Sequence, residues 1–480
     1  MADLTDRRLR ADEDTSPDPD APADPDAVRS RTPAWTREQA GGLARVDDAV
    51  QPVVYPPVDP VSDEVYLWDT WLLRERDGSL ADVGGYRVAF ALTASRDLLP
   101  GKRHDVATIR CFYSADGRSW TSAGPVFRSS EPLGSRQWAG CALWDPDGPG
   151  PSDLYCYYTA AGEVGETELS YGQEIALATG GTLAVAGEAR AAPTGDDGPV
   201  GDGDGLTVEG TFDHESLLRP DGVRYEREAQ SRGMTYTFRD PWFFEDPATG
   251  ETHLLFEANV PVPEDGDACD GDPVGREFNG AVGVARSPTG DPTEWELRDP
   301  LLHSTCVNQE LERPHVVPRD GRYYLFVSSH EHTFAPRIEG FDALYGFVAD
   351  SLHGDYRPLN DAGLVLTNPG NAPFQTYSWI AFSHAEELLV TSFFNYYDLA
   401  GRTLDEVAEL PPEEQFRRFG GTLSPTVRLA LDGDRTRVLG TLAHGHVPRP
   451  DEPLPDLPAR DAAGDRGGYG GSRRGGSRSN

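Results

Sequence analysis

Lysine is almost absent from this sequence of 480 residues: Lys102 is one lysine among 43 basic residues, set against 80 acidic residues. The net charge of −37 excludes a nucleic-acid-binding surface, because such a surface needs clustered positive charge. An acidic surface with few lysines suits molar salt, where the Debye length is about 3 Å and self-repulsion is screened. We therefore expect a halophilic protein. A GC-rich genome that favours arginine codons is the alternative explanation.

Long apolar runs are absent as well, since no stretch approaches the roughly 20 residues that a membrane-spanning helix needs. No hydrophobic segment follows Arg7 and Arg8, so this pair does not indicate a twin-arginine export signal. On this basis we expect a cytoplasmic protein that does not enter a membrane. The five cysteines, at positions 111, 141, 156, 269 and 306, include no CxxC pair, which indicates neither a zinc site nor a disulfide framework.

Turn-forming residues are abundant, with 52 glycines and 40 prolines between short runs of Val, Phe, Tyr and Leu. This pattern is typical of many short strands. Segments 109–120, 282–295 and 344–359 share an apolar strand, a serine, a Gly/Asp turn and an aromatic residue, as hairpins of propeller blades do. Their irregular spacing excludes a WD-type repeat. We expect an all-β propeller over residues 46–450, with a β-sandwich as the alternative.

The two ends of the chain differ from this middle part in composition. Residues 1–45 are acidic and proline-rich, and residues 451–480 are first proline-rich and then rich in glycine, arginine and serine. Both ends contain too few apolar residues to form a core. We expect them to be disordered tails.

Three acidic residues lie in otherwise apolar segments: Asp69 in LWDTW, Asp240 in TFRDPWFFED and Glu312 in ELERPHVV. Most paired carboxylates are structural, and that is the alternative for each acid taken alone. The set of three fits glycoside transfer, in which a nucleophilic carboxylate and an acid/base carboxyl flank the scissile bond about 5–5.5 Å apart. The innermost strands of a propeller bring residues that are distant in sequence to one central pocket.

The segments LWDTW, FRDP, FEAN, ELERP and LYGFVADSLHGDYRPLN occur in this order through the middle of the chain. As an ordered set they resemble glycoside hydrolase family 68, which contains levansucrases, inulosucrases and β-fructofuranosidases. The resemblance implies a five-bladed propeller with a central funnel-shaped active site and a ping-pong reaction on sucrose. It implies that Asp69 is the nucleophile that takes the fructosyl unit. Glu312 is then the general acid/base, and Asp240 stabilises the transition state.

Several neighbours of these acids are candidates for substrate binding. Arg239 and Arg313 can form charge-assisted hydrogen bonds to sugar oxygens or to the acids beside them. Glu310 lies two residues before Glu312, so we expect it on the same face of a strand and in the sucrose pocket.

Aromatic residues and one further acid complete the predicted site. Trp68 and Trp138 offer apolar faces to a sugar ring, with core packing as the alternative for each. The resemblance implies that Tyr377 supports the nucleophile and that Glu257 lies close to the catalytic group. The alternative for both is plain structural bonding.

The sequence also departs from the family pattern. Ala139 stands where the family often has a serine near the nucleophile. His330 stands where some polymerising members carry arginine, and other members, including levan formers, carry histidine. The family's calcium segment lacks its acid, since Gln309 precedes ELER and Met234 lies six residues before Asp240. A hard cation prefers several charged oxygen ligands, so we predict no bound calcium and no other cofactor.

We therefore predict a sucrose-dependent fructosyltransferase that makes levan or fructo-oligosaccharides and also hydrolyses sucrose. Inulosucrase and β-fructofuranosidase activities are alternatives with the same chemistry, and a non-catalytic sugar-binding propeller is the alternative from another class. The expected partners are sucrose and fructan acceptors, with no nucleic acid and no membrane, and the protein is expected to be a monomer. The resemblance to this family also allows an extracellular location.

Overall fold

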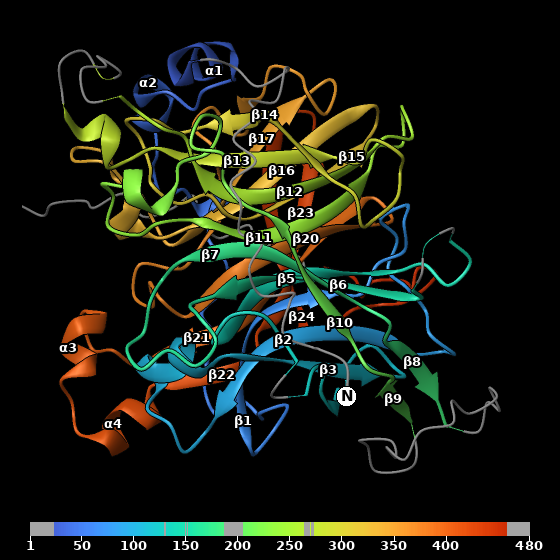
Figure 1. The fold of residues 1–480 in the computed structure, drawn as a ribbon. Coiled ribbons are helices and arrows are strands. Elements are labelled where there is room, and N and C mark those ends of the chain that lie inside the picture. Colours follow the sequence, from blue (N-terminus) through green and yellow to red (C-terminus); the bar gives the residue numbers. More distant parts are fainter. Residues whose placement is uncertain are drawn as a thin grey trace, which may run out of the picture.

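Five antiparallel sheets surround one axis, which confirms the five-bladed propeller expected from the sequence (Figure 1). The structure is a computed structural model that describes residues 24–128, 131–148, 150, 152–186, 205–263, 269 and 273–457. The innermost strands form a closed ring, because β1 contacts β5, β5 contacts β11, β11 contacts β15, β15 contacts β20 and β20 contacts β1. Side chains on these five strands therefore meet near the axis.

Each blade follows the previous one along the chain. From the axis outward, blade I is β1 (Val65–Leu72), β2 (Arg87–Ser95), β3 (Thr108–Ser114) and β4 (Thr121–Pro125). Blade II is β5 (Arg136–Trp144), β6 (Leu154–Ala161), β7 (Gln173–Thr179) and β10 (Asp213–Leu218). Blade III is β11 (Phe238–Glu245), β12 (Thr252–Asn259), β13 (Gly280–Arg286) and β14 (Glu296–His303).

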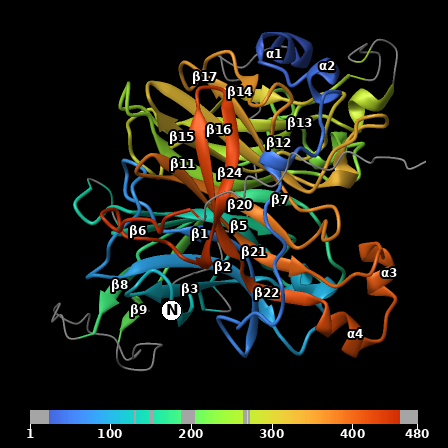
Figure 2. The same ribbon diagram turned by 180° about the vertical axis from the view of Figure 1, so that it is seen from behind.

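Blades IV and V each carry one additional strand. Blade IV is β15 (Glu312–Arg319), β16 (Arg322–Ser329), β17 (Ala343–Ala349) and β18 (Arg357–Pro358), with β19 (Leu364–Thr367) also paired to β17. Blade V is β20 (Thr376–His384), β21 (Glu387–Tyr396), β23 (Pro425–Asp432) and β24 (Arg435–His444), with β22 (Phe419–Leu423) also paired to β21. A separate two-stranded sheet pairs β8 (Thr182–Val185) with β9 (Leu206–Glu209) at the periphery (Figure 2).

The three hairpin segments found in the sequence are the outer parts of three blades. Segment 109–120 leads from β3 to β4, segment 282–295 from β13 to β14, and segment 344–359 from β17 to β18. Inside the blades, β6, β12 and β17 are buried along their whole length, because neighbouring blades cover both of their faces. The sequences of β6 and β17 are accordingly mostly apolar, whereas β12 also buries His253, Glu257 and Asn259. The edge strand β10 is largely exposed.

The segment before the propeller is structured from residue 24, so the expected tail does not include residues 24–45. It contains α1 (Pro25–Arg31) and α2 (Arg37–Ala40), which lie next to β14 and β17 (Figures 1 and 2). Trp35 explains why this segment is structured. The Trp35 side chain is fully buried and packs against Phe334, Tyr345 and Phe347. One large aromatic residue thus anchors a segment whose average composition is polar. The expected tail over residues 1–23 lies outside the described residues.

The opposite end also continues beyond the expected boundary. Glu452 accepts a hydrogen bond from Arg118 of blade I at 2.6 Å, and the carbonyl of Pro455 accepts one from Arg428 at 2.6 Å. Residues 451–457 are therefore held against the propeller. Residues 458–480 lie outside the described residues.

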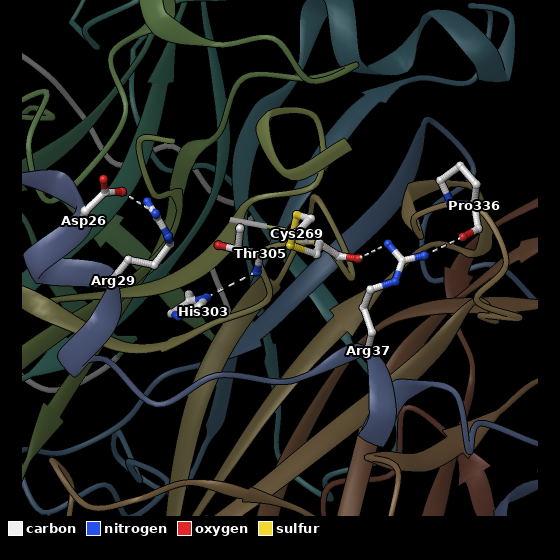
Figure 3. The surroundings of a disulfide bond; sticks show 8 residues. Asp26, Arg29, Arg37, Cys269, His303, Thr305 and Pro336 are labelled. Carbon is white, nitrogen blue, oxygen red and sulfur yellow. Dashed lines mark hydrogen bonds and ion pairs between the residues drawn. A yellow bond between two sulfur atoms is a disulfide. The ribbon is translucent and has the colours of Figure 1, made fainter. Parts of the chain in front are cut away.

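A disulfide joins Cys269 to Cys306, although the spacing of the cysteines indicated no disulfide framework. The pair lies 37 residues apart with no sequence motif, so only the fold brings the two residues together. The carbonyl of Cys306 accepts a hydrogen bond from Arg37 of α2 at 2.9 Å, as Figure 3 shows. The bridge and α2 thereby hold the chain shortly before Glu310 and Glu312. The other three cysteines are free and buried.

The remaining helices are short. They are η1 (Asp47–Ala49), η2 (Pro100–Val106), η3 (Glu228–Gln230), η4 (Pro273–Arg276), η5 (Glu331–Thr333), α3 (Leu404–Ala408) and α4 (Pro412–Arg417). Within the part of the chain that the structure describes, none of the helices is long and apolar enough to span a membrane.

Candidate active site

All five innermost strands are interrupted by a bulge, which no sequence pattern indicated. The pairing register shifts at Asp69 in β1, at Ala139 in β5, after Arg239 in β11, after Glu312 in β15 and after Tyr377 in β20. Four bulge residues have positive φ angles: Asp69 (41°), Asp240 (60°), Arg313 (52°) and Ser378 (58°). Bulges re-aim side chains and are common beside active sites.

The bulge residues line one cavity of about 660 Å³. Its lining includes the three predicted acids Asp69, Asp240 and Glu312, which come from blades I, III and IV. The cavity therefore unites three carboxyl groups that are far apart in sequence, as expected of a propeller site.

Arg239 lies at the centre of the ionic network. Its Nε donates a hydrogen bond to Glu257 Oε2 at 2.7 Å, and its Nη2 donates to Glu310 Oε1 and to Glu312 Oε1, each at 3.0 Å. These three carboxylates raise the pKa of the Arg239 guanidinium well above its usual value, although burial opposes them. Arg239 thus stays charged and fixes the orientation of the Glu312 carboxyl.

Glu312 is poised to carry a proton near neutral pH. Burial, together with the neighbouring Glu310 carboxylate, raises the pKa of Glu312 to about 7, while Arg239 and His330 partly oppose this rise. The hydroxyl of Tyr377 donates a short hydrogen bond to Glu312 Oε2. A carboxyl held near this pKa can act as an acid in one step and as a base in the next.

Asp240 is buried and held on two sides. Its Oδ2 accepts a hydrogen bond from the backbone N–H of Arg313 at 3.1 Å, and its own N–H donates to Thr159 Oγ1 at 2.9 Å. Burial raises the pKa of Asp240, and the Arg313 and Arg239 guanidinium groups oppose this. Arg313 also donates to the carbonyl of Thr70 at 3.0 Å, which links the bulges of β1 and β15.

Asp69 differs from the other two acids. Its side chain is partly exposed to the cavity, and among the described residues no group donates a hydrogen bond to its carboxylate. The buried guanidinium of Arg103 in η2 interacts with it electrostatically. An oriented carboxylate without a competing donor is suited to attack an electrophilic carbon.

Most of the predicted binding residues meet at the cavity. Trp138, Arg239, Glu310, Arg313, His330 and Tyr377 line it, and Ala139 lies in its wall. Glu257 does not line the cavity, and it lies buried behind Arg239, as expected of a supporting acid. Glu310 precedes β15 and so shares no strand face with Glu312, but the two share Arg239 as a partner.

Two predicted roles need correction. Trp68 has no exposed surface and does not line the cavity; it packs edge-to-face against His104, with ring centroids 5.4 Å apart. The packing alternative therefore describes Trp68, because the bulge turns Asp69 and not its neighbour toward the cavity. The hydroxyl of Tyr377 contacts the acid/base candidate Glu312, whereas the sequence led us to expect a contact with Asp69.

The sequence missed several lining residues. They are His104, Tyr171, Gln173, Tyr236, His332 and Ser378. His332 could have been found from its place two residues after His330, and Ser378 from its place beside Tyr377. His104 comes from η2, Tyr171 and Gln173 come from blade II, and Tyr236 comes from the connection to β11. No motif marks any of them.

No metal is needed to hold the acids together. Oxygen atoms of Asp240, Glu257 and Glu312 lie within 4.8 Å of one another, a spacing that could suit a cation. However, the Arg239 guanidinium already pairs with Glu257 and Glu312 and supplies the positive charge. At the expected calcium segment, Gln309 accepts a hydrogen bond from the N–H of Met234 at 3.1 Å and donates one to the carbonyl of Thr235. The Gln309 amide thereby links two loops directly.

Comparison with known sequences identifies relatives along nearly the whole chain. The family model described as Levansucrase/Invertase matches residues 26–448. The extracellular sucrase of Zymomonas mobilis is 32% identical over 440 residues, which cover 88% of this chain and 97% of that protein. The levansucrase of Rahnella aquatilis is 34% identical over 446 residues, which cover 86% of this chain and 96% of that protein.

Solved structures of similar proteins also cover most of the chain. An inulosucrase from Halalkalicoccus jeotgali bound to kestose is 63% identical, with a TM-score of 0.83, and covers 89% of this chain and 100% of that chain. The catalytic domain of a β-fructofuranosidase from Microbacterium saccharophilum is 28% identical, with a TM-score of 0.71, and covers 87% of this chain and 94% of that chain.

Proposed function

Because the chain belongs to the levansucrase and invertase family, glycoside hydrolase family 68, we infer that it is a sucrose-dependent fructosyltransferase. The observation that carries this conclusion is the meeting of Asp69, Asp240 and Glu312 in one cavity. A non-catalytic sugar-binding propeller is not supported, because all three acids are present and the relatives are enzymes.

The proposed first step transfers the fructosyl unit to the enzyme. An Asp69 carboxylate oxygen bonds to the anomeric carbon of the fructosyl unit while the glycosidic C–O bond breaks. The Glu312 carboxyl gives its proton to the departing glucosyl oxygen, so that glucose leaves with its hydroxyl restored. Asp240 stays ionised in the proposal and stabilises the positive charge that develops on the sugar ring. The backbone N–H of Arg313 orients it.

The second step reverses this chemistry. Glu312, now ionised, takes a proton from the acceptor hydroxyl, whose oxygen attacks the anomeric carbon and displaces Asp69. When water is the acceptor the product is fructose, and when a sugar is the acceptor the product is an oligosaccharide. The short hydrogen bond from Tyr377 and the ion pair with Arg239 support the ionised form of Glu312 in this step.

The pH dependence of sucrose cleavage follows from the pKa of Glu312. The first step needs Glu312 protonated, and its pKa is raised to about 7. We therefore expect kcat/KM for sucrose to fall as the pH rises through about 7, because the acid loses its proton. A pH–rate profile at constant salt tests this. A fall of kcat/KM on the alkaline side (the alkaline limb of the profile) that is already centred near pH 4, the ordinary range of a carboxyl pKa, would contradict the assignment of Glu312 as the acid.

We propose further that the products carry β-2,1 linkages. The support is the 63% identity with the inulosucrase from Halalkalicoccus jeotgali, against 34% for the levansucrase from Rahnella aquatilis. The test is incubation with sucrose in molar salt, followed by NMR of the products. Glucose in excess of free fructose demonstrates transfer, and β-2,1 signals support this proposal. Products with β-2,6 linkages contradict it in favour of levansucrase, and no release of glucose contradicts the enzymatic function.

We also propose that the protein is exported and acts as a monomer. A disulfide is typical of oxidising compartments, and one of the relatives is named an extracellular sucrase. One chain brings Asp69, Asp240 and Glu312 together in a single cavity, which supports a site that is complete in a monomer. Sucrose-cleaving activity in the culture medium and a monomer mass by light scattering would support the two proposals. Activity confined to the cell lysate, or a larger mass, would contradict them.

A further inference from the structure

His330 lies between two carboxyl groups at the cavity. Its ring stacks on the ring of Tyr377, with centroids 3.8 Å apart and planes inclined by 7°. Its Nδ1 is 3.1 Å from Asp342 Oδ2, and its Nε2 is 4.0 Å from Glu312 Oε2. Each ring nitrogen therefore faces a carboxyl oxygen, an arrangement that favours an imidazolium with a proton on both nitrogens.

Of the two carboxyl groups beside His330, that of Asp342 is the more deeply buried. It directly precedes β17, and its side chain is 3% exposed. Its Oδ1 accepts a hydrogen bond from the backbone N–H of Glu331 at 2.8 Å, which leaves Oδ2 aimed at His330. Asp342 is not among the residues that line the cavity, so a substrate bound there would meet His330 and not Asp342.

We propose that Asp342 is a positioning residue that places a positively charged His330 beside Glu312. The proposal rests on the proposed function, because the neighbour of His330 matters as the acid/base of that reaction. Within the same cavity, burial lowers the pKa of His104 and of His332. At His330 burial acts in the same direction, but the Asp342, Glu312 and Glu310 carboxylates together outweigh it, with Asp342 first among them, and the pKa of His330 rises to about 9.

Other titratable groups face His330 as well. From η2, the segment before β15, β15 itself, η5 and β20, they are His104, Glu310, Glu312, His332 and Tyr377. The Glu310 and Glu312 carboxyls also favour the charged ring, but neither is within hydrogen-bond distance of it. Among the residues that the structure describes, Asp342 is the one whose carboxyl is hydrogen-bonded to the ring, so of the carboxyls it should have the largest effect on the His330 charge.

The positive charge has a consequence for Glu312. His330 and Arg239 both lower the pKa of Glu312, against burial and the Glu310 carboxylate, which raise it. Asp342 thereby acts on the acid/base through His330, at a distance from the reacting atoms. Without the His330 charge, Glu312 would hold its proton to higher pH, and a smaller fraction of it would be ionised near neutral pH.

The test is Asp342→Asn in the full chain, assayed in molar salt. Asparagine can still accept the hydrogen bond from Glu331 and can donate to His330 Nδ1, so the ring stays placed while it loses its charge. We expect the alkaline limb of kcat/KM for sucrose to move up by roughly one pH unit or more, because a nearby opposite charge shifts a carboxyl pKa by roughly one to three units. Asp361→Asn, at an exposed ion pair with Arg435, is the matched control and should not move the limb.

A second readout is independent of activity. In protein labelled with ¹⁵N-histidine, with the His330 signal identified by its loss in His330→Gln, we expect the wild-type ring to titrate near pH 9 and the Asp342→Asn ring below pH 6.5. Wild-type His330 titrating at or below 6.5 overturns the proposal even when Asp342→Asn does not fold. An unchanged alkaline limb in an active, folded Asp342→Asn overturns it as well. By contrast, a wild-type protein that releases no glucose contradicts the proposed function and leaves the titration result to be judged by itself.

Discussion

Asp69→Asn is expected to lower the rate of glucose release from sucrose by about 10⁴-fold or more, because loss of a catalytic nucleophile removes the covalent route altogether. The amide has nearly the same shape as the carboxylate. Among the described residues no group donates a hydrogen bond to the Asp69 carboxylate, so the substitution breaks no hydrogen bond. It removes the attraction to Arg103 and also the repulsion with Asp240, and these two effects on stability oppose each other. The loss should therefore appear in kcat with an unchanged melting temperature. Initial rates of glucose release and a thermal unfolding curve measure both.

The matched control for Asp69 is Asp59→Asn. Asp59 is an exposed acid before β1, and its replacement removes the same charge without touching the cavity. We expect wild-type rates from it. An Asp69→Asn enzyme that kept a tenth of the wild-type rate would contradict the nucleophile assignment.

Glu312→Gln is expected to lower sucrose cleavage by about 10²- to 10⁴-fold, the usual range for loss of a general acid/base. The loss of activity in Glu312→Gln should depend on the leaving group of the substrate, whereas the loss in Asp69→Asn should not. A nitrophenyl fructoside needs little proton donation, so we expect its first step to be far less impaired than that of sucrose. Azide needs no general base, so it should restore turnover of this substrate and yield a fructosyl azide.

The control and the contradicting result for Glu312 are equally specific. Glu64→Gln changes an exposed glutamate before β1 and should behave as the wild type does. Equal losses on sucrose and on the nitrophenyl fructoside would show that Glu312 is not the proton donor. Asp69→Asn should lose activity on both substrates, and azide should not restore it.

The sequence predicted the propeller and the candidate acids because both depend on local patterns. Short apolar runs between turn residues predicted strands, and the ordered motifs around Asp69, Asp240 and Glu312 placed the acids on them. Segment 109–120 is most of β3 and the turn that leads to β4, as its pattern indicated. These features can be predicted from a single sequence because a strand and its turn are specified by adjacent residues.

Long-range features could not be predicted in this way. Trp68 and Trp138 occupy equivalent places before bulges in β1 and β5, yet Trp68 is fully buried and Trp138 lines the cavity. Alternation along a strand does not hold across a bulge, so the sequence could not tell the two residues apart. The Cys269–Cys306 bridge has no spacing motif for the same reason, since the fold alone brings its ends together.

The Asp342–His330 pair shows which contacts at the site the sequence alone could not predict. His330 was found from the sequence, but its charged partner lies 12 residues later, across the end of β16 and the start of β17. Asp342 stands among apolar residues, as many structural acids do. The contact of Tyr377 with Glu312 was likewise hidden, because it depends on how closely blades IV and V approach each other.

The central claim is that Asp69 forms a covalent bond to the fructosyl unit of sucrose. The most direct test is to quench the wild-type enzyme with acid during turnover of sucrose, digest it and identify the modified peptide by mass spectrometry. The account predicts one added fructosyl unit on the peptide that contains Asp69, and no such adduct in Asp69→Asn. An adduct on a different acidic residue, or steady turnover of sucrose by an enzyme that never carries an adduct on Asp69, would contradict it.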